Sequence, residues 1–478
     1  MRSIWSATTE LPRGLELQKD IAAEAAVIGG GMAGILTAFL LKQRGVSAVV
    51  LEADTAGGGQ TGNTTAKITS QHGLIYEKLL ARFGREGARQ YAAANQAALR
   101  AYRELVETRN IACNFESRPA YLYSTAETEP LEREAKAAAE LGLPAGYTTA
   151  ARLPFPVAGA VRFEEQAQFH PLKFLAALLP ELTVYEHAPV IKVEKDTIYT
   201  KEHTVRAEHI VFASHFPFLN TPGWYFMRMH QERSYVVAVR DRFELDGMYL
   251  SVDPGGLSLR GYDGLILLGG GGHRTGENRE GGRYELLRAA ARRYFPESEE
   301  VAHWSAQDCM PHDNVPYIGR FAHDAPGWYV ATGFQKWGMT SSMAAAMMLC
   351  DLITGKENPN AGIFSPERYV PTAALPAFLK DGAEAVKGLT RELLRVPQEF
   401  ADALPPGHGG VVQEGGEKVG VYKDPEGRTF PVPTRCPHLG CELAFNPDET
   451  SWDCPCHGSR FDHTGKLLDG PAQEDLLG

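Results

Sequence analysis

Two short clusters of cysteine and histidine near the C-terminus are the most chemically specific feature of this sequence. Cys436 and His438 are separated by one residue, fifteen residues then precede Cys454, and two residues separate Cys454 from His457. Thiolates and imidazoles at this spacing bind metal, and two arrangements satisfy the pattern. The four side chains could hold one tetrahedral zinc. They could also hold a [2Fe–2S] cluster, with two thiolates on one iron and two imidazoles on the other.

The segment resembles the Rieske family of [2Fe–2S] domains more closely than any zinc finger, so the cluster is favoured. In that family two histidines replace two thiolates, which lowers the negative charge of the cluster and raises its reduction potential. By this resemblance the iron ligands are Cys436, His438, Cys454 and His457.

Further residues resemble the Rieske proteins of respiratory chains. Cys441 and Cys456 stand where those proteins have a disulfide between the two cluster loops, and Ser459 stands where a hydroxyl points at a bridging sulfur. Gly470-Pro-Ala472 matches the proline loop that covers the cluster. Phe461 departs from the pattern, because a tyrosine is usual there. The chain also stops soon after the proline loop, so we expect a truncated or unusual C-terminus.

A glycine-rich turn near the N-terminus predicts a dinucleotide site. Gly29-x-Gly31-x-x-Gly34 follows the apolar, β-prone run Ala23–Ile28 and opens an apolar helical pattern, and Glu52 closes the next strand. The glycines permit a tight turn and close approach of the pyrophosphate to the helix N-terminus, and the acidic residue accepts hydrogen bonds from the ribose. A glycine-rich turn without a ligand is the alternative.

The N-terminal three quarters of the chain resembles the D-amino-acid oxidase-like flavoproteins, which include glycine and sarcosine oxidases. Besides the turn with Glu52, the resemblance is carried by Gly57–Ala66, Asp313–Gly319 and Ala331–Thr340. It implies FAD as the dinucleotide, with the flavin along the last of these segments. The further residues that it assigns to FAD are Thr65, Ala66, Val190, Gly333, Gly338, Met339 and Thr340.

The same resemblance suggests residues near the face of the flavin. Sarcosine oxidases place a histidine, followed three residues later by glycine, near the flavin, and His273 occupies this position. Those oxidases also have a lysine four residues earlier that promotes reaction with oxygen, whereas this chain has Gly269. Arg260 and Tyr262 are candidates to meet a substrate carboxylate. A structural role for His273 and a solvated Arg260 are the alternatives.

Some relatives attach the flavin to a cysteine near the position of Cys309. The spacing from Cys309 to Asp313 is shorter than theirs. We therefore expect Cys309 to be an unlinked, buried thiol.

Composition limits the class of protein. The 478 residues are 44% hydrophobic and carry a net charge of −11, which indicates a globular protein of several domains and argues against a nucleic-acid partner. No apolar run is long enough for a membrane span, and the N-terminus lacks the apolar core flanked by basic residues that is typical of a signal peptide. A cytoplasmic location follows by default.

These features predict an α/β architecture with a small all-β domain: a Rossmann-type FAD domain, an antiparallel substrate sheet, and a Rieske domain. The flavoprotein part is expected at 1–370, a linker with a docking helix at 371–405, and the Rieske domain at 406–478. Within the first part, the FAD-binding segments are expected at about 20–85, 155–225 and 300–365, and the substrate sheet at about 110–125 and 226–290.

The pairing of the two centres suggests a function. Flavin exchanges either one or two electrons, whereas a [2Fe–2S] cluster accepts one at a time. We therefore expect oxidation of a small amine or amino acid by hydride transfer to FAD, with electrons leaving through the cluster to a one-electron acceptor. The glycine-rich run Gly269–Gly276 lacks the G-x-G-x-x-G spacing and the following helix that an NAD(P)H site would need. An oxygen-using oxidase and a non-catalytic redox sensor are the alternatives.

Overall fold

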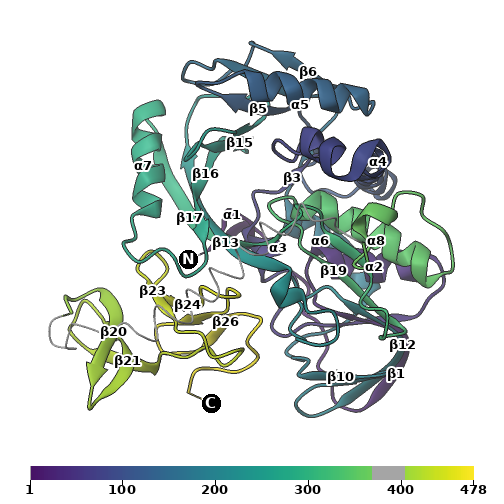
Figure 1. The fold of residues 1–478 in the computed structure, drawn as a ribbon, viewed down its shortest axis with the longest axis vertical. Helices are drawn as coiled ribbons and strands as arrows, with labels where there is room; N and C mark the ends of the chain where they lie inside the picture. Colours follow the sequence, from purple (N-terminus) through teal and green to yellow (C-terminus); the bar gives the residue numbers. More distant parts are fainter. Residues whose placement is uncertain (1, 369–403, 478) are drawn as a thin grey trace.

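The computed structural model describes residues 2–368 and 404–477. Figure 1 shows a large N-terminal part, in purple to green, with the yellow C-terminal strands packed against one side of it. The expected linker and docking helix at 371–405 fall almost entirely outside the described residues. No helix of the described part is long and apolar enough to cross a membrane.

A mainly parallel sheet forms the first layer. β1 (Ile21–Ile28) pairs in parallel with β2 (Ala48–Leu51) and with β12 (Thr204–Phe212). β9 (Thr183–Tyr185) extends the sheet beyond β2, and β19 (Trp328–Thr332) pairs in parallel with β12. The second half of β1 is buried throughout, as is typical of a parallel strand covered on both faces. The antiparallel strands of this sheet are β10 (Lys192–Glu194), β11 (Thr197–Tyr199) and β18 (Tyr317–Arg320).

Helices cover this sheet. α2 (Met32–Gln43) follows the glycine turn directly and packs against α8 (Gly338–Ile353). The turn needs its glycines, because Gly29 has φ +111° and a Cβ on Gly34 would lie 1.9 Å from the Gly29 carbonyl oxygen. The other helices of this part are α1 (Ile4–Thr8), α3 (Gln60–Asn63), α4 (Tyr76–Arg109), α5 (Glu129–Glu140), α6 (Pro171–Leu178) and α7 (Arg283–Tyr294).

The second layer is an eight-stranded sheet, mostly antiparallel, in the order β17-β13-β16-β15-β14-β5-β7-β6. Its strands are β5 (Ala120–Ser124), β6 (Ala145–Thr148), β7 (Gly159–Phe163), β13 (Met229–Arg240), β14 (Met248–Ser251), β15 (Ser258–Tyr262), β16 (Leu265–Arg274) and β17 (Glu299–Pro311). The sheet is larger than expected, since β6, β7 and β17 lie outside the ranges assigned to it. β17 joins because it pairs with β13 along nearly its whole length.

A third, small sheet lies between these layers and consists of β3 (Lys67–Ile68), β8 (Ala167–Gln168) and β4 (Glu116–Ser117). It carries the end of the loop assigned to FAD toward the larger antiparallel sheet.

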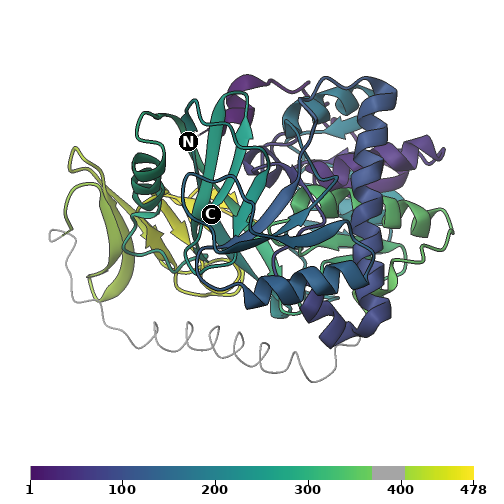
Figure 2. The same ribbon diagram turned by 90° about the horizontal axis from the view of Figure 1, so that it is seen from above.

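The C-terminal part contains two small antiparallel sheets. The first consists of β20 (His408–Glu414), β21 (Glu417–Lys423) and β22 (Thr429–Pro433), and the second of β23 (Ala444–Asn446), β24 (Ser451–Asp453), β25 (Arg460–Asp462) and β26 (Leu467–Asp469). The two clusters of cysteine and histidine occupy the connections before β23 and between β24 and β25. Figure 2 shows the second sheet against the long strands of the antiparallel layer, so the C-terminal part sits at the end of β13 and β17.

Candidate functional site

A cavity of about 1320 Å³ lies where the parallel sheet, the antiparallel sheet and the C-terminal part meet. Gly29, Gly31 and Glu52 line one end, at the carboxyl edge of β1 and β2, where ligands bind in open α/β sheets. Thr65 and Val190 also line the cavity, as do Gly338 and Met339 at the start of α8. The structure therefore brings together seven of the residues expected at FAD.

Four of the residues assigned to FAD do not line the cavity. Gly34 packs α2 on the turn, and Gly333 lies in the connection before α8 with φ +74°. The Thr340 hydroxyl donates to the Thr69 carbonyl at 2.9 Å and accepts from the Thr69 N–H at 2.8 Å. Ala66, fully buried with φ +55°, precedes β3. These residues shape the wall through the backbone.

Arg260 does not line the cavity. Its guanidinium is buried and donates hydrogen bonds to the carbonyl oxygens of Thr65 and Ala66. It also lies 5.4 Å from the ring centre of Trp5. The geometry supports a role in holding the 65–66 backbone in place, since no nitrogen of Arg260 points at the cavity.

His273 also lies away from the cavity wall. Its Nε2 is 3.0 Å from the Tyr235 hydroxyl, and its Nδ1 is 2.7 Å from the Arg274 carbonyl oxygen. Both ring nitrogens are therefore engaged at the end of β16. Tyr235 itself lines the cavity and so stands between His273 and the expected flavin.

Lys67 is a cavity residue that sequence reasoning missed. Its Nζ contacts the Ser258 hydroxyl and lies 3.4 Å from the Tyr249 carbonyl oxygen, and no carboxylate pairs with it among the described residues. Burial lowers the pKa of Lys67 to about 7, and the Arg260 guanidinium adds to the effect. The signal in the sequence that could have identified Lys67 is its position directly after the 57–66 loop, which was assigned to FAD.

Cys309 behaves as expected from its sequence. It is a free, buried thiol whose Sγ lies 3.4 Å from the His215 carbonyl oxygen. Burial raises its pKa well above the ordinary value, which makes it a poor nucleophile.

The four expected iron ligands lie together. The rings of His438 and His457 are 4.9 Å apart, centre to centre. A hydrogen bond from the Cys454 thiol lowers the pKa of Cys436 to about 7, and Ser459 hydrogen-bonds the same sulfur. The Cys441–Cys456 disulfide is present as expected and links the two loops.

Unpaired nitrogens show that these residues fit a cluster. The Nδ1 atoms of His438 and His457 are buried and have no hydrogen-bond partner in the described part of the chain. Burial lowers the pKa of His438 to about 4 and that of His457 to about 3, so both rings are neutral and free to bind metal. Cys441 and Cys456 also lie near Cys454, but their disulfide excludes them as ligands.

The outer edge of the cluster site faces the N-terminal part. The Nε2 of His438 donates to Asn220 Oδ1 at 2.7 Å. The ring of Phe226 lies 5.5 Å from that of His457 and 6.2 Å from that of His438, centre to centre. The two parts of the chain therefore meet at the histidine side of the site.

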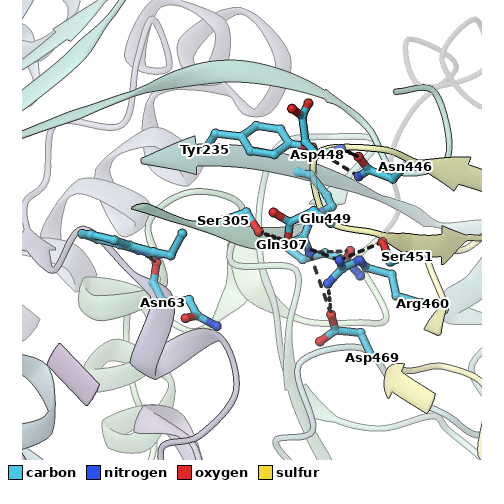
Figure 3. A network of polar contacts seen from close by, with 12 residues as sticks. Asn63, Tyr235, Ser305, Gln307, Asn446, Asp448, Glu449, Ser451, Arg460 and Asp469 are labelled. Atoms are coloured by element: carbon cyan, nitrogen blue, oxygen red, sulfur yellow. Dashed lines mark hydrogen bonds and ion pairs between the residues drawn. The ribbon is translucent and has the colours of Figure 1, made fainter. Parts of the chain in front are cut away.

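A buried polar network holds the same interface (Figure 3). Glu449, from the C-terminal part, accepts from Arg233 at 2.9 Å and from the Tyr284 hydroxyl at 2.6 Å. Arg460 donates to Asp469 at 2.9 Å, and the Asp469 carboxylate lies 3.8 Å from Arg233. Arg233 of the N-terminal part therefore faces two carboxylates of the C-terminal part, and Arg460 compensates the same two carboxylates from within that part.

The C-terminal part also contributes to the cavity wall. Residues 469–473, which include the expected proline loop, line the same cavity as the glycine turn. The Ser459 hydroxyl, next to the cluster ligands, accepts from the Ala472 N–H at 3.0 Å and so holds this loop. A loop of the cavity wall therefore contacts a residue beside the cluster ligands.

Comparison with known proteins agrees with this division. Residues 24–352 match the family model DAO, FAD dependent oxidoreductase, and residues 395–477 match the Rieske [2Fe-2S] domain. A protein of Bacillus subtilis (strain 168) named as a Rieske 2Fe-2S iron-sulfur protein, YhfW, is 36% identical over 489 residues. That alignment covers 99% of this chain and 96% of that protein.

Solved structures share the fold of the N-terminal part. Glycine oxidase from Geobacillus kaustophilus has a TM-score of 0.63 and 21% identity, and the match covers 73% of this chain and 99% of that one. L-proline dehydrogenase from P. horikoshii has a TM-score of 0.61 and 17% identity, covering 74% and 98%. The expected fold class, a flavoprotein of this type followed by a small all-β Rieske domain, is confirmed.

The matched families imply the two cofactors, FAD and a [2Fe–2S] cluster, and the residues at both sites suit them. The chain belongs to the DAO family of FAD-dependent oxidoreductases and carries a C-terminal Rieske [2Fe–2S] domain.

Proposed function

We propose that this oxidoreductase dehydrogenates a small amine or amino acid and passes the electrons, one at a time, through the Rieske cluster to an external one-electron acceptor. The observation that carries the proposal is the shared cavity. Its wall combines the glycine turn, at Gly29 and Gly31, with residues 469–473 of the Rieske domain. An electron leaving this cavity meets the cluster site directly behind that loop.

The chain's own residues have defined parts in this proposal. When bound, FAD would accept a hydride and release electrons one at a time. The residues proposed to hold it are Gly29, Gly31, Gly34, Glu52, Thr65, Ala66, Val190, Gly333, Gly338, Met339 and Thr340. The α2 N-terminus offers N–H groups to the pyrophosphate. The proposed iron ligands are Cys436, His438, Cys454 and His457.

The structure changes the roles proposed for Arg260 and His273, the two residues that the sequence suggested as catalytic. Arg260 is better explained as support for the loop at Thr65 and Ala66. His273 reaches the cavity only through Tyr235, so a direct contact with substrate needs a different side-chain position.

The substrate class is supported by the names of the structural neighbours, a glycine oxidase and an L-proline dehydrogenase. Gly269, which stands where sarcosine oxidases have lysine, favours a dehydrogenase over an oxygen-using oxidase. We also propose a cytoplasmic location, supported by the free thiols Cys113, Cys309 and Cys350. Cell fractionation tests that location.

Anaerobic reduction tests the proposed function. Amines and amino acids are mixed singly with the purified protein without oxygen. Flavin bleaching followed by the rhombic EPR signal of a reduced Rieske centre supports it. Peroxide formed in air at the rate of substrate loss would favour an oxidase, and no bleaching with any amine would favour a redox sensor.

A further inference from the structure

Two buried glutamines connect the cavity wall to a ligand of the cluster. Gln307 on β17 lines the cavity, and its Nε2 donates to Gln231 Oε1 on β13 at 2.7 Å. Gln231 Nε2 then donates to the backbone carbonyl of His457 at 2.6 Å. Both side chains are almost completely buried, at 1% and 2% exposure. A continuous line of three residues therefore runs from the cavity to an iron ligand.

The surrounding contacts fix the direction of both amides. Gln307 Oε1 faces two donors, the Arg233 guanidinium and the Thr275 hydroxyl, each at 3.3 Å. Its NH₂ group must therefore point the other way, toward Gln231 and toward the Gly458 carbonyl at 2.8 Å. With its oxygen occupied by Gln307, Gln231 can only donate onward to the Rieske domain. Neither amide can flip without leaving a buried group unpaired, which is costly.

The position of the bridge also explains why glycine follows His457. Gly458 has φ +83°, and a Cβ there would lie 2.7 Å from Gln231 Cβ. The loop approaches Gln231 closely only because this residue lacks a side chain. The Rieske loop and the glutamine pair are thus fitted to each other.

Building on the proposed function, we propose that the Gln307–Gln231 pair is the connection across which electrons leave the flavin cavity for the cluster. The two glutamines act as positioning residues that hold His457 at a fixed distance from the cavity. Oxidation of one amine to an imine releases two electrons and two protons. The electrons cross in two single steps, each followed by transfer to the external acceptor, and the protons go to solvent.

Flash photolysis tests this without a known substrate. Photoreduced 5-deazaflavin delivers one electron to the flavin, and the later bleaching of the cluster gives the transfer rate. Gln231→Met and Gln307→Met keep the side-chain length but remove the hydrogen bonds. We expect transfer to be several-fold slower, because without these hydrogen bonds His457 is no longer held at a fixed distance from the cavity.

A matched control and a double variant separate this role from simple stabilisation. Gln166→Met alters a buried glutamine that hydrogen-bonds Ser70, outside both the cavity wall and the bridge, and should leave the rate unchanged. The double variant should be no slower than the slower single variant, because both act on one connection. Limited proteolysis and the midpoint potential of the cluster should stay as in the unmodified protein, since docking persists.

The possible outcomes distinguish a failure of the glutamine bridge from a failure of the proposed electron route. Unchanged transfer in docked single variants would overturn the bridge, and so would slow transfer that accompanies proteolytic release of the Rieske domain. If the unmodified protein shows no transfer from flavin to cluster, the proposed electron route itself fails, independently of the glutamines.

Discussion

Glu449 offers the strongest test of how the two domains stay together. Its carboxylate is 12% exposed and accepts hydrogen bonds from Arg233 and Tyr284 of the flavoprotein domain and from Ser305. Arg233 is 2% exposed, so its charge has little water to stabilise it. Glu449→Ala would leave this guanidinium with the more distant Asp469 carboxylate, 3.8 Å away.

The size of the effect follows from burial. Removing one partner of a buried ion pair costs about 3–5 kcal/mol, because the other charge stays behind uncompensated. Asp469 and the Gln307 amide still face Arg233, which favours the lower end. At about 1.4 kcal/mol per factor of ten, the ratio of docked to undocked Rieske domain should fall by about a hundredfold or more.

Two measurements report this change. Limited proteolysis should release the Rieske domain faster, and flash-induced electron transfer from flavin to cluster should lose amplitude in proportion to the undocked fraction. Glu414→Ala, at an exposed glutamate on β20 of the same domain, is the control and should change neither. Retention of the EPR signal shows that the Rieske domain itself is still folded.

Gly276 provides an independent perturbation without any change of charge. It has φ +82°, and a Cβ there would lie 2.6 Å from the backbone nitrogen of Pro455 in the second cluster loop. Gly276→Ala should therefore undock the domain as well. The reasoning is refuted if Glu449→Ala and Gly276→Ala both keep the proteolysis rate and the electron-transfer amplitude of the unmodified protein.

The remaining predictions concern charge and potential. Ser459→Ala should lower the midpoint potential of the cluster by about 20–60 mV. One hydrogen bond is worth about 0.5–1.5 kcal/mol, and about 59 mV corresponds to a tenfold change in the equilibrium constant for one electron. Phe461→Tyr should raise the potential, because it adds a hydroxyl. Film voltammetry measures both; no shift in either would contradict the argument. Asn220→Ala should raise the same potential, since a ligand that donates to an acceptor is more basic and favours oxidised iron; an unchanged or lower value would count against this. Burial would raise the pKa of Glu449, but the arginines beside it hold it below its ordinary value of 4.5. Its contribution to docking is therefore complete above pH 4.5 and lost as the pH falls below, so proteolysis should accelerate only in acid. Lys67 should react with acetic anhydride near pH 7, as mass spectrometry can show, and reactivity that begins only near pH 10 would disprove its lowered pKa.

The chemistry of both centres was readable from short stretches of sequence. Gly29 to Gly34 lie within one turn, and each cluster loop brings its own cysteine and histidine, so local spacing alone carries the information. Such motifs work because the backbone geometry they need is set by neighbouring residues. The Cys441–Cys456 pairing also followed from the resemblance and is confirmed.

Roles that depend on burial were less predictable. Arg260 was expected to face a substrate or solvent, yet its charge is held by backbone carbonyls that lie almost two hundred residues earlier. Lys67 carries no motif, and only the closing of the cavity around it lowers its pKa. A side chain's charge state depends on what surrounds it in space, which sequence spacing does not report.

Sequence by itself therefore determined the two cofactors and their order along the chain. Only the tertiary structure decided that the Rieske domain docks with its histidine side on the flavoprotein, lines the same cavity as the glycine turn and meets Gln231 and Gln307. The physical reason is that this interface joins residues from β13 and β17 to loops some 150 to 230 residues later. Contacts of this kind arise from the shape and charge of two folded surfaces, and neither surface exists until its domain has formed.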